Sequence, residues 1–365
     1  MTHQSDEGDF AQLLQENVPL AQFTTFGVGG PARFFADATT SAAMATGLSW
    51  AHAKGLPVFV LGGGSNVIIA DRGFPGLVLR NAIAGLETSV ENEHVIVAAG
   101  GGEDWDGVVA RCVERRWAGF ECLSGIPGSV GATPIQNVGA YGQEVAETIV
   151  AVSAIDTQSC MRVEFTNSEC EFDYRTSRFK VRDRGRFVIT RVTYRLSRNG
   201  KPKVRYMELQ LRLTGAGIRE PSLADVREAV LAIRRSKAMV IDPADPDSRS
   251  VGSFFINPVV TPGEFEKIQP HAARRGVNAE NIPTFPAGGG KVKLAAAWLI
   301  EHSGFEKGYR YGNVGISKKH ALAIVNRGGG TAREVLELAG RIKFRVRETF
   351  GVTLVPEPLF VGFDS

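Results

Sequence analysis

The sequence predicts an α+β protein. Two patterns favour this class: segments with the periodicity of helices are mixed with short apolar runs of strand length, and several of these runs follow one another as hairpins instead of alternating strictly with helices. The chain has 365 residues, of which 43% are hydrophobic and 22% are charged, so it can bury a large core. A chain of this length is expected to form two or three domains.

The first expected elements are a helix, a strand, a glycine loop and a second strand. Helical periodicity covers 41–54, and a glycine and a proline follow it closely, as they do at many helix ends. Strands are expected at 57–61 and 67–70, on the two sides of the loop Gly62–Asn66.

The middle of the chain is expected to be rich in strands. A strand at 94–99 leads through three glycines into a helix that starts at about Asp104, and strands dominate from Ile149 to Leu196. Pro221 and Ser222 then open a helix. The apolar face of this helix is formed by Leu223, Val226, Val230 and Ile233.

The last third begins with a boundary signal. The segment 242–250 contains two prolines and three aspartates, which is typical of a linker between domains. Further on, Thr331 and Glu334 form a capping box ahead of an amphipathic helix, and Gly351 is expected to end it.

The charge balance argues against two classes of partner. The chain has 42 basic and 39 acidic residues, and a net charge of +3 over this length gives no electrostatic footprint for nucleic acid or for an anionic membrane. The longest apolar runs are too short to span a bilayer, and the polar start Met1–Glu7 has no apolar core typical of a signal peptide. We therefore expect a cytoplasmic protein.

The cysteines and histidines indicate neither a disulfide framework nor a metal site. No two cysteines form a C-x-x-C pair, which favours reduced and packed thiols, and the histidines lie apart without the spacing of metal ligands, so we expect no metal. The cysteines are Cys112, Cys122, Cys160 and Cys170; the histidines are His3, His52, His94, His271, His302 and His320.

The glycine loop Gly62–Asn66 leaves two interpretations open. A P-loop or a Rossmann fingerprint requires a helix after the glycines, whereas the next element here is a strand. The loop is then either a tight β-turn or a backbone nest that holds a diphosphate. A further match to the Rossmann pattern at 27–32 has no apolar strand before it and no acidic residue at the expected distance after it, so we discard it.

A second glycine-rich stretch, 124–142, has no clear period. Ordering so many glycines is costly unless something binds there. A surface loop would also leave Ile126, Val130, Ile135 and Val138 in water, which favours a loop that is packed and functional.

Seven motifs together resemble the UDP-N-acetylenolpyruvoylglucosamine reductase family. They occur in the family's order between about Thr24 and Gly362. The motifs are Thr25–Gly27, Leu61–Asn66, Ile126–Gly128, Pro134–Gly142, Tyr174–Arg175, Gly252–Phe255 and Pro356–Glu357.

This resemblance implies a fold and a reaction. The fold is the FAD-binding fold of the vanillyl-alcohol-oxidase type with a third, substrate-binding α+β domain. The reaction uses noncovalent FAD, with NADPH as hydride donor, to reduce UDP-N-acetylglucosamine enolpyruvate, a step of peptidoglycan precursor synthesis in cell-wall biogenesis. No histidine lies in either glycine loop, in agreement with a flavin that is not covalently linked. A monomer is the family's expectation.

The resemblance also divides the chain into three parts. Residues 1–78 form the first part of the FAD-binding region, to which the tail 356–365 is expected to return. Residues 79–238 form the second part of that region, and residues 239–355 form the substrate-binding domain.

Three residues are implied to carry the chemistry. Reduction of a C=C bond conjugated to a carboxylate needs a cation for the carboxylate, a donor for the growing charge and an acid for the adjacent carbon. By motif, Arg175 is the cation, Ser253 the proton donor and Glu357 the group that completes the site. Judged from the residues alone, Arg175 is one arginine in a basic strand region and Ser253 an ordinary turn residue.

Further positions carry over for the two ligands. The implied FAD-binding residues are Leu61, Gly62, Gly63, Gly64, Ser65, Asn66, Ser124, Ile126, Pro127, Gly128, Gly131, Asn137, Gly139, Ala140 and Tyr141. The implied substrate contacts are Tyr206, Lys237, Asn257, Phe285 and Lys307. Phe285 stands where relatives with a long loop in the third domain usually have a tyrosine, so it lacks that hydroxyl. Lys307 lies in a segment that is one residue longer than the usual pattern.

Two other functions compete with this one. The chain could be another FAD-dependent oxidoreductase of the same fold, such as a hydroxy-acid or sugar oxidase, or a non-catalytic flavin or nucleotide-sugar binding protein. The implied set of Arg175, Ser253 and Glu357 argues against both.

Overall fold

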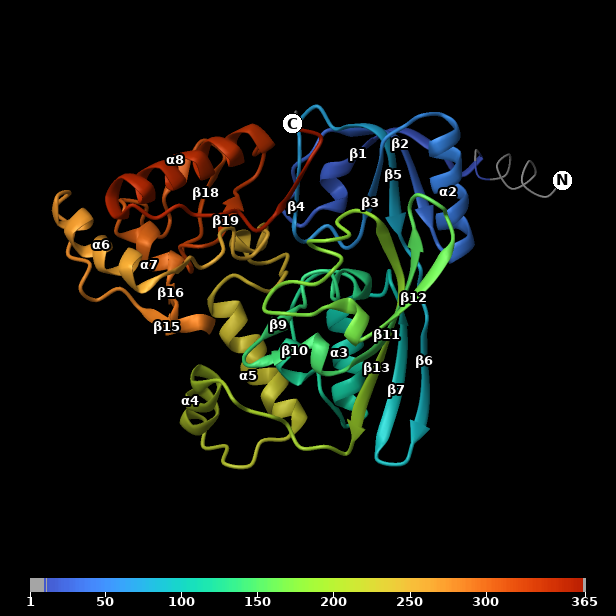
Figure 1. Cartoon of the computed structure of the whole chain (residues 1–365), viewed down its shortest axis with the longest axis horizontal. Helices are drawn as coiled ribbons and strands as arrows, with labels where there is room; N and C mark the ends of the chain where they lie inside the picture. Colours follow the sequence, from blue (N-terminus) through green and yellow to red (C-terminus); the bar gives the residue numbers. More distant parts are fainter. Residues whose placement is uncertain (1–9, 11, 364–365) are drawn as a thin grey trace. The chain divides into compact units, whose positions relative to one another are not determined.

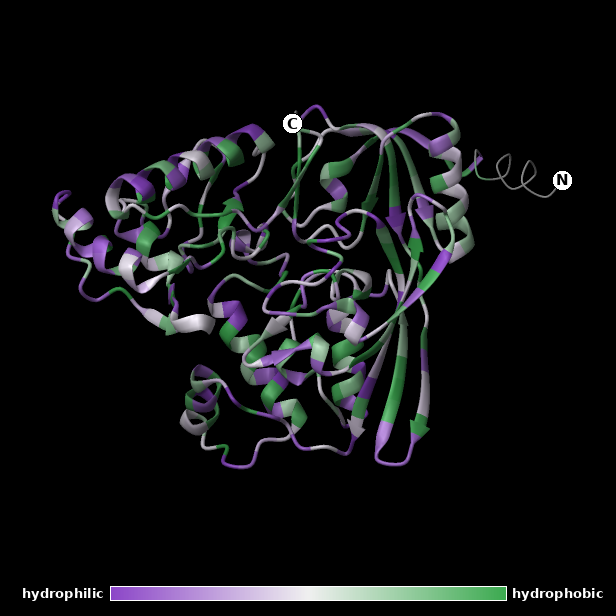
Figure 2. Cartoon of the chain, in the orientation of Figure 1, coloured by the Kyte–Doolittle hydropathy of each residue, from purple (hydrophilic) through white to green (hydrophobic). Residues whose placement is uncertain are grey.

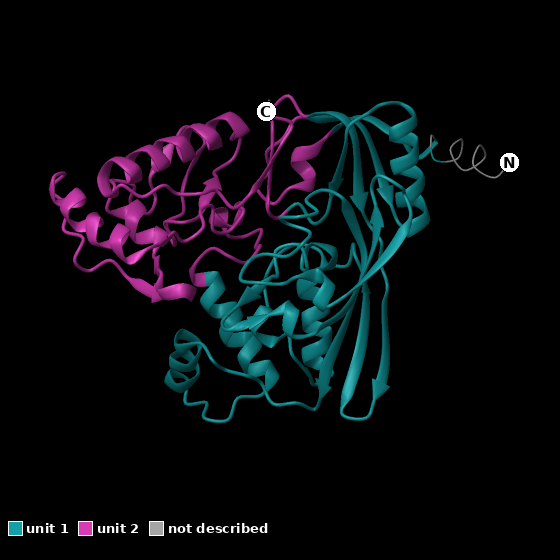
Figure 3. Ribbon diagram, in the orientation of Figure 1, with its two compact units in different colours: residues 1–18, 31–64, 74–235 teal, residues 19–30, 65–73, 236–365 magenta. Residues whose placement is uncertain are grey.

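The structure is a computed structural model that describes residues 10 and 12–363. The polar start of the chain and His3 lie outside the described residues. The chain divides into two compact units (Figure 3). Unit 1 comprises 1–18, 31–64 and 74–235, and unit 2 comprises 19–30, 65–73 and 236–365.

Unit 1 contains a four-stranded sheet with parallel neighbours. Its strand order is β1 (Gln15–Pro19), β2 (Pro31–Ala38), β5 (Phe74–Asn81) and β3 (Val58–Leu61). Both β2 and β3 pair with β5 in parallel, and helix α2 (Ser41–Ala53) connects β2 to β3. This local β-α-β arrangement departs from the expected hairpins, because periodicity shows that a strand exists but not which strand it pairs with.

The larger sheet of unit 1 is antiparallel, as expected (Figure 1). Its strands, in spatial order, are β12 (Arg162–Thr166), β11 (Ile149–Asp156), β13 (Phe187–Arg198), β7 (His94–Gly100) and β6 (Leu86–Glu91), with β8 (Trp117–Ala118) also paired to β13. Helix α3 (Trp105–Glu114) follows β7, and the carboxylate of its N-cap Asp104 accepts a hydrogen bond from the Gly107 amide. The start of this helix is therefore confirmed.

Two further helices complete unit 1. They are α4 (Met207–Gly215) and α5 (Leu223–Ser236). All four residues of the predicted apolar face of α5 are buried, so the helical periodicity is confirmed. Three of them pack with Cys122 and with residues of α4, and Leu223 belongs to the cluster that covers the large sheet.

Unit 2 contains short sheets and helices around one apolar cluster. Its helices are α6 (Pro262–Ala273), α7 (Ala296–Glu301) and α8 (Ala332–Phe350). Its strands are β14 (Val259–Val260), β15 (Thr284–Pro286), β16 (Val292–Leu294), β17 (Arg310–Tyr311), β18 (Val314–Ile316), β19 (Ile324–Asn326), β20 (Leu359–Val361) and β4 (Val67–Ile69). β20 pairs in parallel with β4, which comes from the far end of the sequence.

Helix α8 confirms the predicted capping box. The Thr331 hydroxyl accepts from the Glu334 amide, the Glu334 carboxylate accepts from the Thr331 amide, and Gly351 ends the helix at φ 72°. Hydrophobic and hydrophilic residues alternate along α8 (Figure 2), and its apolar face lies in the cluster of unit 2. The Asp71 carboxylate accepts from the first free amides of the helix, those of Ala332 and Arg333, at 2.7 and 3.0 Å.

The linker predicted at 242–250 is wrong. The chain passes from unit 1 to unit 2 between 235 and 236, and the predicted linker packs inside unit 2. Asp247 is 4% exposed, and its carboxylate accepts from the Ser317 hydroxyl and the Lys318 amide, both at 2.7 Å. Composition suggests a solvated segment here because it cannot reveal that these aspartates find donors inside the fold.

No helix within the described ranges is long and apolar enough to span a membrane.

Candidate active site

Two glycine loops of unit 1 pack directly against each other. A Cβ built on Gly63 would lie 2.7 Å from the Cα of Gly128 and 3.0 Å from the amide nitrogen of Ser129. A Cβ on Gly62 would lie 2.8 Å from the Ser129 hydroxyl oxygen. No side chain fits at these separations without a shift, so the close approach of the two backbones requires glycine. The first loop is therefore more than an isolated turn.

The second loop is anchored on the core of unit 1. The Val130 amide donates to the Glu103 carbonyl at 2.9 Å, and the Gly131 amide donates to the Gly101 carbonyl at 2.8 Å. Val130 is fully buried in the apolar cluster that covers the large sheet. The expectation that this glycine-rich stretch is packed is confirmed for Val130 and Val138, which are buried. It is wrong for Ile135, which is 37% exposed because the turn it lies in faces solvent, and Ile126 is partly exposed.

The residues implied to bind FAD fall into two groups by exposure. Leu61, Gly64, Ser124, Gly131, Asn137 and Gly139 are buried. Gly62, Gly63, Ser65, Asn66, Ile126, Pro127, Gly128, Ala140 and Tyr141 are partly or fully exposed. The buried group shapes the loops, and the exposed group offers the surface that a ligand can contact.

Asn137 illustrates the first group. Its side-chain amide donates to the Glu144 carboxylate at 2.8 Å and to the Asp173 carbonyl at 3.1 Å, and its side-chain oxygen accepts from the Ala146 amide at 3.1 Å. The residue is 1% exposed. Its side chain therefore ties the glycine-rich loop to the turn that carries Arg175.

Tyr141 lies beside one of the implied substrate contacts. Its ring packs edge-on against the Tyr206 ring, with the ring centroids 5.6 Å apart. Burial raises the pKa of the Tyr141 hydroxyl to about 12, and the neighbouring Arg234 guanidinium opposes this shift. The Tyr141 phenol is thus neutral, and able to donate, throughout the physiological range.

Arg175 lies at the tip of a tight turn. Asp173 and Thr176 pair through both backbone hydrogen bonds, and Arg175 between them has φ 55°. Its guanidinium donates to the Gly139 carbonyl, and its own carbonyl accepts from the Lys180 ammonium at 2.8 Å. A non-glycine residue in this left-handed conformation is uncommon and is held by its surroundings.

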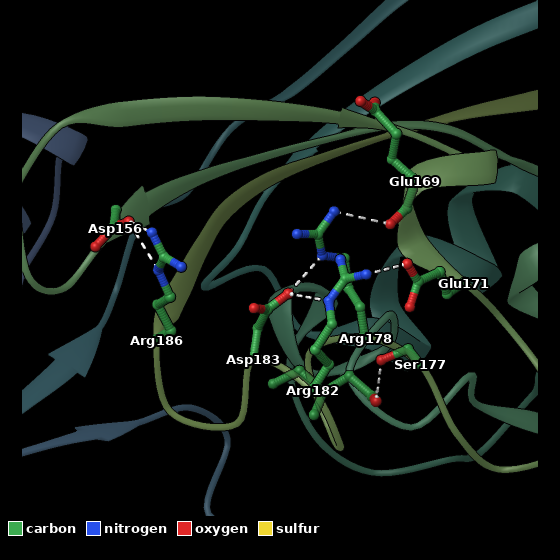
Figure 4. A network of polar contacts seen from close by, with 9 residues as sticks. Asp156, Glu169, Glu171, Ser177, Arg178, Arg182, Asp183 and Arg186 are labelled. Atoms are coloured by element: carbon green, nitrogen blue, oxygen red, sulfur yellow. Dashed lines mark hydrogen bonds and ion pairs between the residues drawn. The ribbon is translucent and has the colours of Figure 1, made fainter.

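Ion pairs hold the segment that follows Arg175 (Figure 4). Arg178 and Arg182 both contact the Asp183 carboxylate, at 2.7 and 3.3 Å. Burial alone raises the pKa of Asp183, but the hydrogen bonds and charges of the two arginines lower it overall. The Ser177 hydroxyl donates to the Ile135 carbonyl at 2.5 Å, which joins this segment to the glycine-rich loop.

In unit 2 the chain brings Ser253 and Glu357 onto adjacent backbone segments. Phe255 and Pro356 form an antiparallel bridge, and the Glu357 amide donates to the Phe254 carbonyl at 2.9 Å. Phe254 and Phe255 are buried, whereas Ser253 and Glu357 are partly exposed. The two implied catalytic residues therefore lie on paired backbone segments although they are 104 positions apart in the sequence.

The implied substrate residues of unit 2 have different local surroundings. The Asn257 side-chain oxygen accepts from the Ala296 amide at 2.9 Å, at the start of α7. Phe285 is 44% exposed on β15 and lies opposite Lys293 of β16, whose ammonium is 5.9 Å from the Phe285 ring centroid.

Two implied lysine contacts also lie in unit 2. Lys307 is 3.7 Å from the Glu301 carboxylate, and Lys237 directly follows the end of α5. The implied catalytic residues are therefore divided between the units, with Arg175 in unit 1 and Ser253 and Glu357 in unit 2.

One cavity in unit 2, of about 330 Å³, contains none of the predicted residues. Its lining residues are Ser303, Gly304, Phe305, Tyr309, Arg341, Phe344 and Arg345. Across residues 10 and 12–363, no group of three or more His, Cys, Asp and Glu side chains is placed to hold a metal ion.

Three residues with a supporting role were not predicted from the sequence. Asp106 of α3 accepts from the Gly125 amide at 2.6 Å and forms a two-point ion pair with Arg227 of α5, and the Arg234 Nε donates to the Gly125 carbonyl at 3.2 Å. The amide and the carbonyl of Gly125 are thus both hydrogen-bonded to charged side chains. The seven-residue spacing of Arg227 and Arg234, which places them on one face of α5, was the available signal.

Comparison with known proteins connects this geometry to a family. Residues 32–161 match the family model of an FAD binding domain, and residues 243–361 match that of the C-terminal domain of UDP-N-acetylenolpyruvoylglucosamine reductase. The chain is 48% identical to UDP-N-acetylenolpyruvoylglucosamine reductase of Thermobifida fusca, over 95% of this chain and 97% of the relative. It is 47% identical to the protein of the same name from Streptomyces coelicolor, over 95% of this chain and 90% of the relative.

The solved structure of UDP-N-acetylenolpyruvylglucosamine reductase from Thermus caldophilus aligns with a TM-score of 0.64 at 25% identity, over 95% of this chain and 99% of that one. The expected fold, an FAD-binding region joined to a further α+β domain, is confirmed by these matches. The resemblance carried by the seven motifs is confirmed as well, and the chain belongs to the UDP-N-acetylenolpyruvoylglucosamine reductase family.

Proposed function

We propose that this chain reduces the enolpyruvyl group of UDP-N-acetylglucosamine enolpyruvate with NADPH, through bound FAD, to give UDP-N-acetylmuramate. The chain is an FAD-dependent oxidoreductase of peptidoglycan precursor synthesis, as its family membership indicates. In the balanced reaction, a hydride adds to the terminal carbon of the double bond and a proton adds to the adjacent carbon, while NADPH becomes NADP⁺.

The exposure of the glycine loops supports a role in holding the diphosphate of FAD. Gly63 is exposed and Gly128 is partly exposed, so backbone N–H groups beside the contact of the two loops would be available to an anion. The partly exposed residues 62–66, 126–128 and 140–141 would hold the cofactor. When bound, FAD accepts hydride from the nicotinamide and supplies it to the substrate.

The residues of the chain would supply charge, orientation and the proton. The Arg175 guanidinium, fixed on the Gly139 carbonyl, would neutralise the substrate carboxylate, whose negative charge grows as hydride adds. Ser253 would donate the proton to the adjacent carbon and recover it from water. Glu357, on the backbone segment beside Ser253, would complete the polar surroundings of the reacting carbons.

The remaining implied contacts would bind the UDP part of the substrate. Tyr206 and Lys237 are expected near the diphosphate, because a phenol can donate to phosphate oxygens and a lysine is a natural point-charge partner. Asn257 and Lys307 would contact the nucleotide. Phe285 can stack but cannot donate a hydrogen bond, so the Lys293 ammonium beside its ring offers the nearest cation on that strand pair.

The observation that supports the proposal is the pairing of Phe255 with Pro356, since it sets the backbone segments that carry Ser253 and Glu357 side by side. A hydroxyl and a carboxylate on adjacent segments suit the proton transfer that this reduction requires. We further propose that the enzyme is a cytoplasmic monomer and that it has the three-domain organisation implied by its family.

The test separates the two half-reactions by stopped-flow absorbance of the flavin. Ser253→Ala should leave flavin reduction by NADPH intact and slow reoxidation by the enolpyruvyl substrate by at least the roughly 10²- to 10⁴-fold typical of general acids. Ser253→Cys serves as the matched control, because a thiol can also donate a proton. Reoxidation of the alanine variant within a few-fold of normal would assign the proton to Glu357 or water.

Flavin content provides a second, independent check. The purified protein should be yellow and release FAD on acid or heat denaturation. A colourless protein that cannot be reconstituted with FAD, or a flavin that remains attached to the denatured chain, would contradict the proposed noncovalent cofactor.

A further inference from the structure

The Thr25 hydroxyl connects two segments that the proposed function assigns to different tasks. It donates to the Ser250 carbonyl at 2.9 Å and lies 3.4 Å from the Ser65 carbonyl. Ser65 belongs to the first glycine loop, and Ser250 lies three residues before Ser253. All of these residues belong to unit 2. A single hydroxyl hydrogen shared between two carbonyls favours the nearer one, so the contact with Ser250 is the stronger.

Ser250 transmits this contact to the proton donor. Its hydroxyl accepts from the Gly252 amide at 3.1 Å, and its backbone forms an antiparallel bridge with Val325. Gly252 has φ 72°, a left-handed conformation that turns the chain immediately before Ser253. The orientation of Ser253 therefore depends on a turn whose first residue is held by Thr25.

The neighbouring threonine has a different role. The Thr24 hydroxyl accepts from the Gly27 amide and lies 3.1 and 3.2 Å from the Ala21 and Val28 carbonyls, all within its own turn. Thr24 thus shapes the local turn, whereas Thr25 makes contacts 40 and 225 residues away. The two adjacent residues form a natural pair for comparison.

We infer that Thr25 is a positioning residue, which sets Ser253 relative to the end of the flavin loop at Ser65. This inference rests on the proposed role of Ser253. A second hydrogen bond to the same loop involves Leu359, which lies two residues after Glu357. The Leu359 amide donates to the Asn66 carbonyl at 3.0 Å. The loop end at 65–66 is therefore the common anchor of the segments that carry Ser253 and Glu357.

The experiment compares Thr25→Val, Thr25→Ser and Thr24→Val in the FAD-loaded enzyme. Valine keeps the shape of threonine and removes the hydroxyl, and serine restores it. Thr25→Val should slow reoxidation by the enolpyruvyl substrate about 10- to 100-fold, in line with a small misplacement of a reacting group. It should leave reduction by NADPH within twofold and raise the solvent deuterium isotope effect on reoxidation, because transfer of the proton becomes more limiting.

Hydrogen exchange gives a readout that does not depend on turnover. Backbone amides at 252–254 should exchange faster in Thr25→Val than in the unmodified enzyme, and Thr25→Ser should return both the exchange and the reoxidation rate towards normal. Thr24→Val should lower thermal stability without changing reoxidation. If Thr24→Val and Thr25→Val slow both half-reactions alike, Thr25 is only part of a structural turn and the inference fails.

Ser253→Ala, measured in parallel, separates this inference from the proposed function. If Ser253→Ala reoxidises within a few-fold of normal, the proton-donor assignment fails first. If Ser253→Ala is slow while Thr25→Val is within twofold of normal, the assignment stands and the positioning role of Thr25 is wrong.

Discussion

Arg175 in unit 1 and Ser253 in unit 2 are positioned in opposite ways. Arg175 occupies the tip of a turn, and side-chain contacts hold it: its own guanidinium on Gly139, and Asn137 on the neighbouring carbonyl of Asp173. Ser253 instead lies between a left-handed glycine and the buried Phe254, in a segment fixed by backbone pairing. Arg175, the proposed cation, therefore depends mainly on polar side chains. Ser253, the proposed proton donor, depends mainly on backbone pairing, to which the Thr25 hydroxyl adds one contact.

The largest effect expected from this comparison is at Arg175 itself. Arg175→Lys keeps the charge but loses the planar fork that reaches the Gly139 carbonyl, so reoxidation by substrate should fall by about 10²- to 10³-fold, the range found for single groups that stabilise developing charge. Flavin reduction by NADPH should be nearly unchanged. Arg191→Ala is the matched control, because the side chain of this arginine is 40% exposed and that of its ion-pair partner Glu87 is 75% exposed. Normal reoxidation in Arg175→Lys would show that the fork is not needed.

The next effect concerns the loop packing of unit 1. Gly63→Ala places a Cβ 2.7 Å from the Gly128 Cα, and overpacking of this kind costs about 1–3 kcal/mol. We expect FAD affinity to fall about 10- to 100-fold, measured by flavin fluorescence on titrating the apoprotein. Gly215→Ala, where the added Cβ meets nothing within 4 Å, should retain FAD normally. Equal affinities in the two variants would mean that the loops can separate without loss of the cofactor.

A smaller effect is expected at Asp106. Burial alone raises the pKa of its carboxyl, but the Arg227 hydrogen bonds and the Gly125 amide lower it overall. The charged form is thus stabilised in the folded state, and its contribution is present above the ordinary carboxyl pKa and lost as the pH falls through the lowered value.

Asp106→Asn should therefore destabilise the protein by about 1–2 kcal/mol at neutral pH, and the difference should shrink below about pH 4. Thermal unfolding at a series of pH values measures this. Glu228→Gln, at an exposed carboxylate 3.9 Å from Arg235, should leave the midpoint unchanged. A difference that stays constant down to pH 3 would contradict a role for the Asp106 charge.

The smallest effect is expected in the number of cysteine thiols that a reagent can modify. This number shows whether solvent reaches the core of unit 1. Burial raises the pKa of Cys112, Cys122 and Cys170 to about 12, so these thiols remain protonated and unreactive, whereas Cys160 is partly exposed. Titration of the native protein with a disulfide reagent should therefore modify one thiol, and denatured protein should show four. Fast modification of a second thiol would indicate that the core opens.

Local features of the fold could be predicted because short-range contacts decide them. The Asp104 cap and the Thr331–Glu334 capping box involve residues within one helical turn, so the sequence displays them directly. The parallel pairing of β2 and β3 with β5 and the burial of Asp247 depend on partners far away in the sequence, and periodicity does not identify such partners.

The candidate site divides in the same way. Motifs identify the glycine loops and the residues implied to be catalytic, since these stand in short, ordered patterns. Thr25 stands in one of these motifs, but its contact with Ser250 and the roles of Asp106 and Arg234 could not be found so, because each acts on a carbonyl or amide that only the fold brings near it. Their side chains resemble those of any surface helix or turn until the partner atoms are known.

The pairing of β4 with β20 has a consequence for the order of events during synthesis. β4 follows the first glycine loop directly, yet its strand partner and the Gly362 carbonyl that accepts from Arg72 come 290 residues later. While the ribosome extends the chain, the Thr25 hydroxyl and the Gly30 amide are already available near the end of that loop, but the strand partner of β4 is missing. Such distant contacts form late and slowly. We therefore expect a nascent chain to carry an unpaired strand edge at β4 for most of its synthesis.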